Sequence, residues 1–443
     1  MRVEIQEKEL FKSLIYKNFN MELNNINGIC TDSREVEQGD IFIPIKGERL
    51  DPHQFIPNVI EKKPSIIFSE IKFQSKNIIK VESTKKTLKK LSSDWVDFFK
   101  APIIAITGSN GKTTTKEMLN NIFSSICKTN YTRGNYNSSI GLPINLFEFC
   151  LDAKVSILEM GANKANEIDY LCQIAKPYYS LITNIQNAHI GNFNSLNDLI
   201  NTKISIFKNT DKNGKIFENL DDINIVNNSA DKQNKVQFSF KDCNVDFFGE
   251  FKTIKEKNYF FINGKEIFNT QLNKIMAQNM LASYSIATVF GIDHKIIKKA
   301  FQKFQFLKGR GEQIKKNGYL IVDDTYNANF ESFQLGINSF MKINCKGKKI
   351  LIIGDMKELG SKSKQYHSDL GKYINTKQPN IVFSFGNLIH ETIYQIKNKK
   401  IISEHFKTID SLIDNLKSIL NKGDAIYLKA SRSMKFENII DKI

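Results

Sequence analysis

The sequence predicts an α/β protein of three domains, in which a small α/β domain is followed by two larger domains built on parallel sheets. Three observations predict this architecture. Short apolar runs alternate with helical stretches, which is typical of parallel sheets covered by helices. The length of 443 residues suits about three domains. A hydrophobic fraction of 41%, with 33 Phe, can fill several cores. We predict domains at residues 1–98, 99–312 and 313–443.

The first domain is predicted from short strands, turns and one helix. Residues 40–45 and 65–68 are apolar runs that indicate strands. Residues 88–99 have the apolar spacing of an amphipathic helix. Pro102 then marks a boundary, because proline interrupts regular structure.

The second and third domains share one pattern of apolar runs separated by helical stretches. The expected strands of the second domain are at residues 103–107, 155–158 and 180–184. Those of the third domain are at residues 319–322, 350–353, 381–384 and 425–428. Residues 208–272 are polar and irregular, and we expect them to form small strands and loops at the edge of the second domain. Each of the two domains is thus an open α/β sheet.

The composition of the chain argues against a membrane-spanning, secreted or disulfide-rich protein. The chain has no run of 18 apolar residues, so we expect no membrane span. Residues 1–15 lack the apolar stretch and cleavage site of a secretory signal. The six cysteines are scattered and none is in a C-x-x-C pair, which argues against a zinc site or a disulfide framework. A cytoplasmic location is the simplest expectation.

The formal charge of +16 has two interpretations. A basic surface can bind nucleic acid, or it can be a solvated surface that reflects a general abundance of lysine. No basic block is interleaved with aromatic residues for base stacking, so we expect no nucleic-acid partner. The charge would also attract acidic small substrates such as nucleotides.

The strongest local signal is a glycine turn between a predicted strand and a predicted helix. Gly108 and Gly111 permit unusual backbone angles, and amides at a helix start attract anions. Lys112 would place a charge on the outer phosphates, and the Thr113 hydroxyl could bind Mg²⁺. Two residues separate the glycines instead of the four of the general pattern. The loop predicts ATP binding by Thr107, Gly108, Ser109, Asn110, Gly111, Lys112, Thr113 and Thr114.

Three further residues of the second domain are candidates for metal binding or catalysis. Glu159 and His189 follow predicted strands, where ligands of open α/β sheets bind, and could hold Mg²⁺. The alternative for Glu159 is an ordinary charged residue at a strand end, and the alternative for His189 is a histidine that caps a loop. Lys203 lies on the apolar stripe of a predicted helix, where an unpaired charge is costly. Its alternative is a side chain that extends to the surface.

Polar loops follow three predicted strands of the third domain. They are residues 323–329, which contain two Asp and two Asn, residues 354–358 and residues 429–433. Arg310 lies between glycines just before this domain. Each loop alone could be a simple turn, since Asp and Asn are common in turns. Three such loops at strand ends favour a binding face.

These segments together resemble the Mur ligases of peptidoglycan synthesis over nearly the whole chain. The amino-terminal match lies in residues 31–35, 39–43 and 46–49. The central match lies in residues 107–115, 134–137, 140–143 and 159–163. The final match lies in residues 323–329, 354–356 and 431–435. The run Asp-Asp-Thr-Tyr-Asn-Ala-Asn at 323–329 discriminates best among the members of this superfamily.

The resemblance implies a fold and an activity. The family plan is a UDP-substrate domain, a central ATPase domain with a phosphate loop, and a Rossmann-like acceptor domain. The implied enzyme is an ATP-dependent ligase that uses Mg²⁺ and joins D-alanyl-D-alanine to UDP-N-acetylmuramoyl-tripeptide through an acyl phosphate. We expect a cytoplasmic monomer. The alternatives are a related ligase of different amino-acid specificity and a basic ATP-binding protein without ligase activity.

The resemblance also implies roles for residues. Lys112, His189 and Lys203 are the implied catalytic residues, with Lys203 carbamylated by CO₂. Thr113, Glu159, His189 and the modified Lys203 are the implied metal ligands. The implied ATP contacts outside the phosphate loop are Asn279, Arg310 and Asp324. The implied substrate contacts are Ser33 and Lys46 for the UDP-linked substrate, Asn327, Asn329 and Asp355 for the dipeptide, and Asn137.

The sequence also departs from the family pattern at several positions. Residues 189–194 lack a usual Glu, Ser205 stands where a Glu usually follows the lysine, and Met276 replaces a common Asn.

Overall fold

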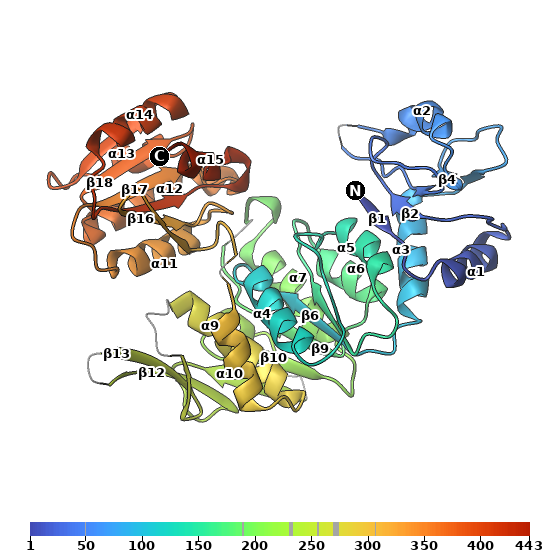
Figure 1. Ribbon diagram of the computed structural model, residues 1–443, viewed down its shortest axis with the longest axis horizontal. Helices are drawn as coiled ribbons and strands as arrows, with labels where there is room; N and C mark the ends of the chain where they lie inside the picture. The colour runs from blue at the N-terminus through green and yellow to red at the C-terminus, as the bar shows by residue number, and fades with distance from the viewer. Residues whose placement is uncertain (49, 188–189, 230–233, 255–256, 269–273, 306) are drawn as a thin grey trace.

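The computed structural model describes residues 1–443 except 49, 188–189, 230–233, 255–256, 269–273 and 306. The described residues form three sheets that follow one another along the chain. Figure 1 shows the amino-terminal and carboxyl-terminal sheets on opposite sides of the central one. The α/β architecture with parallel sheets that the sequence predicts is confirmed, while the residue boundaries of the domains stay a prediction.

The amino-terminal sheet has the order β1-β2-β3-β4-β5, with β1 antiparallel to β2 and the other strands parallel. Its elements are β1 (Arg2–Glu4), α1 (Lys8–Phe19), β2 (Gly28–Cys30), β3 (Ile41–Phe42), α2 (Ile56–Glu61), β4 (Ile66–Ser69), β5 (Ile78–Lys80) and α3 (Thr84–Val96). The strand expected at 40–45 is reduced to β3. The Trp95 indole donates to the Leu146 carbonyl at 3.0 Å, which anchors this domain to the central one.

The central sheet has nine strands in the order β14-β13-β12-β11-β10-β9-β6-β8-β7. Its strands are β6 (Ile103–Thr107), β7 (Thr129–Tyr131), β8 (Val155–Glu159), β9 (Tyr179–Ile182), β10 (Lys215–Asn219), β11 (Lys235–Ser239), β12 (Phe247–Ile254), β13 (Lys257–Ile262) and β14 (Lys265–Phe268). Its helices are α4 (Lys112–Ser124), α5 (Gly141–Asn145), α6 (Glu167–Ile174), α7 (Leu196–Asn209), α8 (Ile223–Val226), α9 (Lys274–Val289) and α10 (His294–Lys303). The β6 strand matches the predicted residues 103–107.

Residues 208–272 are more regular than the sequence predicts. The β10 strand pairs in parallel with β9 and is therefore an interior strand of the sheet. Ile216 and Phe217 on β10 and Phe238 on β11 are buried in the core, although polar residues are frequent in the surrounding segment. Their burial explains why a polar segment extends the sheet, because alternate residues of a strand face opposite sides.

The carboxyl-terminal sheet has the order β15-β16-β20-β17-β18-β19, with only β15 antiparallel. Its strands are β15 (Glu312–Lys316), β16 (Tyr319–Asp323), β17 (Lys349–Gly354), β18 (Ile381–Phe385), β19 (Ile402–Phe406) and β20 (Ala425–Lys429). Its helices are α11 (Phe330–Met341), α12 (Ser363–Lys377), α13 (His390–Tyr394), α14 (Ile409–Ile419) and α15 (Glu437–Lys442). All four predicted strands are present. No helix among the described residues is long and apolar enough to cross a membrane.

Candidate active site

The phosphate loop connects β6 to the start of α4, as the sequence predicts. Gly108 has φ +147° and Gly111 has φ +86°, angles that favour glycine. A Cβ atom on Gly108 would collide with the Thr183 hydroxyl, and one on Gly111 would collide with the Asn279 amide. Asn279, on α9, therefore lies directly against the loop. Both glycines are needed for their backbone angles and for these close approaches.

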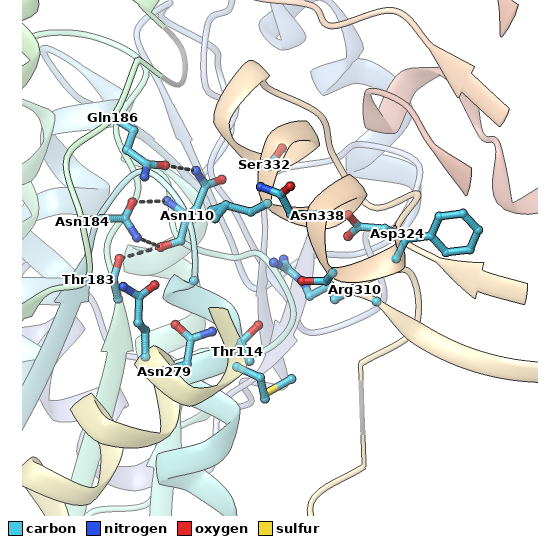
Figure 2. Close-up of a pocket in the computed structure, with 18 of the residues that line it drawn as sticks. Asn110, Thr114, Thr183, Asn184, Gln186, Asn279, Arg310, Asp324, Ser332 and Asn338 are labelled. Atoms are coloured by element: carbon cyan, nitrogen blue, oxygen red, sulfur yellow. Dashed lines mark hydrogen bonds between the residues drawn. The ribbon is translucent and has the colours of Figure 1, made fainter. Parts of the chain in front are cut away.

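Asn110 is held in the loop by polar residues that follow β9 (Figure 2). Its backbone amide donates to Asn184 Oδ1 at 3.0 Å, and its side-chain amide donates to Gln186 Oε1 at 2.7 Å. The Thr183 hydroxyl donates to the Asn110 carbonyl at 2.6 Å. The sequence singled out Asn110 only as a phosphate contact. These hydrogen bonds fix the loop before any ligand binds.

The buried Lys203 and the partly exposed Lys112 share one carbonyl of this loop. Lys112 Nζ donates to the Gly108 carbonyl at 2.8 Å, and Lys203 Nζ donates to the same oxygen at 3.2 Å. Lys203 is 3% exposed, so the sequence prediction that it faces inward is confirmed and the surface alternative is wrong. Burial lowers the pKa of Lys112 below its ordinary value. Burial, and then the charge of Lys112, lower the pKa of Lys203 well below its ordinary value.

Glu159 ends β8 beside the phosphate-loop strand β6 and is 1% exposed. Its Oε1 accepts a hydrogen bond from Asn137 Nδ2 at 2.6 Å. Its Oε2 is buried and has no hydrogen-bond partner within the part of the chain that the structure describes. A buried carboxylate oxygen needs a partner, and a divalent cation would supply one. Glu159 therefore fits a metal ligand. His189 lies outside the described residues.

Arg310, which lies just before the third domain, reaches the phosphate loop. Its Nη2 donates to the Thr113 hydroxyl at 3.0 Å, and its guanidinium carbon lies 3.8 Å from the centre of the Tyr326 ring. Stacking on an aromatic ring fixes a guanidinium group and is favourable. The sequence analysis missed Tyr326, because an aromatic residue in a polar loop does not reveal its partner.

Asp324 is held by two residues of β20 that the sequence analysis also missed. The Tyr427 hydroxyl and Lys429 Nζ each lie 2.7 Å from Asp324 Oδ2. Lys429 is 3% exposed. The Asp324–Lys429 ion pair thus sets the position of the carboxylate that faces the cavity.

A cavity of about 1120 Å³ lies between the central and third domains (Figure 2). Its lining brings together many of the residues that the sequence predicts for ATP: Asn110, Gly111, Thr114, Asn279, Arg310 and Asp324. It also includes Asn327 and Asn329. The phosphate loop and the third domain therefore face one common space.

The three predicted dipeptide contacts already have structural partners. Asn329 Oδ1 accepts from the Ser332 amide at 2.8 Å and caps α11, while its Nδ2 donates to Asn110 Oδ1 at 2.9 Å. Asn327 Oδ1 accepts from the Ala328 amide. Asp355 Oδ1 accepts from the amides of Leu388 and Ile389, each at 2.9 Å. Their proposed contacts with the dipeptide stay a prediction. The measured geometry gives Asn329 the separate role of joining two domains.

The predicted UDP contacts lie in the amino-terminal domain, apart from the phosphate loop. The Ser33 carbonyl accepts from Lys62 Nζ at 2.9 Å. Lys46 is exposed and lies 3.9 Å from the Asp51 carboxylate. Their roles also stay predictions.

Two departures from the family pattern have local explanations. The Ser205 hydroxyl donates to the Thr202 carbonyl of its own helix, so this position adds no anion near Lys203.

Gly191, in η3 (Ile190–Asn192), donates its amide to the Glu358 carbonyl at 3.1 Å. A side chain at Gly191 would collide with the backbone of residues 358–360. This glycine permits close contact between the central and third domains.

Replacing Asn329 with Ser should lower kcat/KM for ATP without unfolding α11. Serine caps helices about as well as asparagine, but it cannot donate an amide hydrogen to Asn110. A lost hydrogen bond of this kind should lower kcat/KM for ATP by about 5-fold. Steady-state kinetics of Asn329→Ser, Asn110→Ser and the double variant would measure the coupling. Independent effects of the two substitutions would contradict the proposed interdomain link.

His367 makes the stability of the third domain depend on pH. It is buried, accepts from the Met356 amide at 3.0 Å, and donates through Nδ1 to the Ser363 carbonyl at 2.8 Å. Burial lowers its pKa below the ordinary value of 6.5. The contribution of neutral His367 to the free energy of unfolding is fully present above about pH 6.5 and is lost as the pH falls through the folded-state pKa.

The free energy of unfolding should therefore fall between about pH 6.5 and pH 5, and less steeply in His367→Gln. Urea unfolding across this range would measure both slopes. The variant Lys417→Gln, at an exposed position of the same domain, serves as the control and should keep the wild-type slope. Equal slopes in wild type and His367→Gln would contradict the assignment.

The chain is similar to Mur ligases by three comparisons. A family model described as the Mur ligase middle domain matches residues 106–307, and one described as "Mur ligase, glutamate ligase domain" matches residues 309–432. Two relatives carry the name "UDP-N-acetylmuramoyl-tripeptide--D-alanyl-D-alanine ligase". The one from Buchnera aphidicola subsp. Baizongia pistaciae is 35% identical, over 95% of this chain and 92% of the relative. The one from Bacillus subtilis is 30% identical, over 94% and 92%.

Solved structures agree with this result. The MurF ligase from Thermotoga maritima in complex with ADP matches with a TM-score of 0.83 and 30% identity, over 94% of this chain and 96% of that one. A MurF structure from Acinetobacter baumannii matches with a TM-score of 0.88 and 26% identity, over 99% of both chains.

Proposed function

This chain belongs to the Mur ligase family, and we propose that the residues around its phosphate loop carry out the ligase reaction described below. The reaction joins D-alanyl-D-alanine to UDP-N-acetylmuramoyl-tripeptide at the expense of ATP, in peptidoglycan precursor synthesis. One observation supports the site assignment above the others. Lys112, Lys203 and Arg310 all contact the phosphate loop, although Arg310 precedes the third domain and Lys203 lies on a separate helix.

The loop holds the phosphates of ATP. Lys112 offsets the negative charge that builds up as the γ-phosphoryl group is transferred. Arg310 approaches the same phosphates from the third domain, and Asn279 contacts the adenine. The site is complete only when the third domain rests on the central one, and this arrangement also excludes water that would hydrolyse the acyl phosphate.

Thr113, Glu159, His189 and a modified Lys203 would hold Mg²⁺. The unpartnered Glu159 Oε2 supports this assignment. The cation, when bound, offsets charge on the phosphate oxygens. No group of three or more His, Cys, Asp or Glu residues that could hold a metal occurs among the described residues. Phosphate oxygens and a modified lysine would supply the missing anionic ligands.

Lys203 becomes such a ligand by reacting with CO₂. Its neutral amine nitrogen bonds to the carbon of CO₂ and releases one proton, which leaves an anionic carbamate. The lowered pKa of Lys203 supports this step, because only the neutral amine is a nucleophile. The carbamate would also pair with the charged side chain of Lys112. The hydrogen-bond acceptors of Lys112 are otherwise two neutral backbone carbonyls.

The peptide bond forms in two steps. The terminal carboxylate of the tripeptide attacks the γ-phosphorus of ATP, and ADP leaves. The amine of D-alanyl-D-alanine then attacks the acyl carbon, phosphate leaves, and the amine loses a proton. Asn137 lies beside Glu159 and contacts the tripeptide, while Ser33 and Lys46 hold the UDP group. The protein acts as a cytoplasmic monomer without nucleic acid.

The decisive experiment follows product formation. The protein is incubated with Mg-ATP and UDP-N-acetylmuramoyl-tripeptide, with and without D-alanyl-D-alanine, and phosphate and product mass are recorded. We expect phosphate release that requires both substrates and a UDP-pentapeptide product. Product with a single amino acid instead of the dipeptide would favour a ligase of different specificity. Salt-sensitive binding of nucleic acid without product would favour an ATP-binding protein that is not a ligase.

A further inference from the structure

Lys116 is a buried charge that the proposed chemistry does not use. It lies on α4, four residues beyond Lys112, and its side chain is completely buried. Lysine is almost never fully buried without partners that compensate its charge. A lysine in this position, one helical turn from the phosphate loop, therefore calls for a functional explanation.

The partners of Lys116 lie in the segment that follows β7. Its Nζ donates to the Thr132 carbonyl at 2.6 Å and to the Gly134 carbonyl at 3.1 Å. It also pairs with the Glu117 carboxylate at 2.8 Å. The ammonium group thus connects the phosphate-loop helix to the backbone of residues 132–134.

The same segment holds Glu159 at two points. The Thr132 hydroxyl accepts a hydrogen bond from the Glu159 amide at 2.9 Å. Asn137, at the end of the segment, donates to Glu159 Oε1 at 2.6 Å, and its carbonyl accepts from the Gly161 amide at 2.8 Å. The backbone of Glu159 is therefore set by Thr132, whose carbonyl Lys116 holds, and its side chain by Asn137, three residues beyond Gly134 in the same segment. The remaining oxygen, Oε2, has no partner within the described part of the chain.

We propose that Lys116 is a positioning residue that orients Glu159 for binding the divalent cation. The inference rests on the proposed function, in which Glu159 is a metal ligand. Residues that orient metal ligands typically affect metal affinity almost as strongly as the ligands themselves. Lys116 does so by holding the backbone from which Asn137 and Thr132 reach Glu159.

Direct binding of Mn²⁺ in the presence of ADP, followed by electron paramagnetic resonance, tests this role without measuring turnover. Lys116→Met is expected to weaken Mn²⁺ binding by about 10-fold. Asn137→Ser should weaken it comparably, and the double variant should be little worse than either single one, because both substitutions break the same chain of contacts. If Lys116→Met does not fold, Lys116→Gln, whose shorter, uncharged side chain removes the ammonium group from the Thr132 and Gly134 carbonyls, is measured with the same expectation.

Lys316→Met is the matched control. Lys316 Nζ donates to the Ile440 carbonyl at 2.8 Å in the third domain, so this variant loses a similar bond far from Glu159. It should leave Mn²⁺ affinity unchanged. Wild-type affinity in folded Lys116→Met or Lys116→Gln, with weakened binding in Glu159→Gln, would overturn the positioning role alone. Wild-type affinity in Glu159→Gln would overturn the metal assignment of the proposed function and this inference with it.

Discussion

Replacing Lys112 with Met is expected to lower the rate of phosphoryl transfer by about 1000-fold. Lys112 is partly exposed at the phosphate loop, where desolvation lowers its pKa, so its proposed interaction with the transferring phosphoryl group is stronger than it would be in bulk water. Methionine has a similar length and no charge. Single-turnover measurement of acyl-phosphate formation, at saturating ATP, would isolate this step from ATP binding.

The same substitution should stabilise the protein in the absence of ATP. Lys112 and Lys203 donate to one carbonyl, and the pKa of each is lowered, which means that the fold disfavours two charged amines there. Removing one amine relieves this cost, as is common when a functional group is lost from an active site. Thermal unfolding would show a higher Tm for Lys112→Met. The exposed Lys299→Met is the control and should change neither activity nor Tm. Near wild-type turnover in Lys112→Met would contradict the assigned role.

Replacing Lys203 with Ala is expected to lower turnover by about 100-fold or more, because the proposed carbamate ligand of the metal is lost. Added acetate should restore part of the activity, since its carboxylate can occupy the space that the carbamate leaves. Lys203→Arg tests whether Lys203 acts as a carbamate or as an unmodified cation, because arginine keeps the positive charge but does not form a carbamate. We expect Lys203→Arg to be as inactive as Lys203→Ala.

The modification itself can be observed. Protein equilibrated with ¹³C-labelled CO₂ should give a carbamate signal in the ¹³C NMR spectrum that is missing from Lys203→Arg. Turnover should decrease in buffer freed of CO₂ and return when bicarbonate is added. Full turnover without CO₂, together with full activity of Lys203→Arg, would show that the unmodified ammonium is sufficient.

The stability of the phosphate-loop region without ligand should depend on pH through Lys203. Its pKa is lower in the folded than in the unfolded state, so the unfolded chain binds more protons between the two pKa values. The free energy of unfolding should therefore rise with pH up to about 10.5 and fall as the pH decreases through the folded-state pKa. Denaturant unfolding at a series of pH values should show that the free energy of unfolding changes less steeply with pH in Lys203→Met than in wild type. Identical slopes would mean that the buried amine stays protonated.

The sequence by itself determined the local parts of this protein. The apolar run at 103–107 and the glycine turn after it specify β6, the phosphate loop and the start of α4, because neighbouring residues dictate these backbone conformations. The helical spacing around Lys203 placed this lysine on a buried face. The family resemblance rests on similarly short segments.

Only the tertiary structure decided how these parts meet. Lys203 shares the Gly108 carbonyl with Lys112 across a separation of 95 residues, and Asn329 reaches Asn110 across 219. Nothing near Lys116 in the sequence indicates that it fixes the segment that orients Glu159. A hydrogen bond between distant segments depends on the packing of sheets and helices, which one segment does not specify alone. The sequence therefore predicted most residues of the proposed site, and the packing of three sheets decided which of them contact one another.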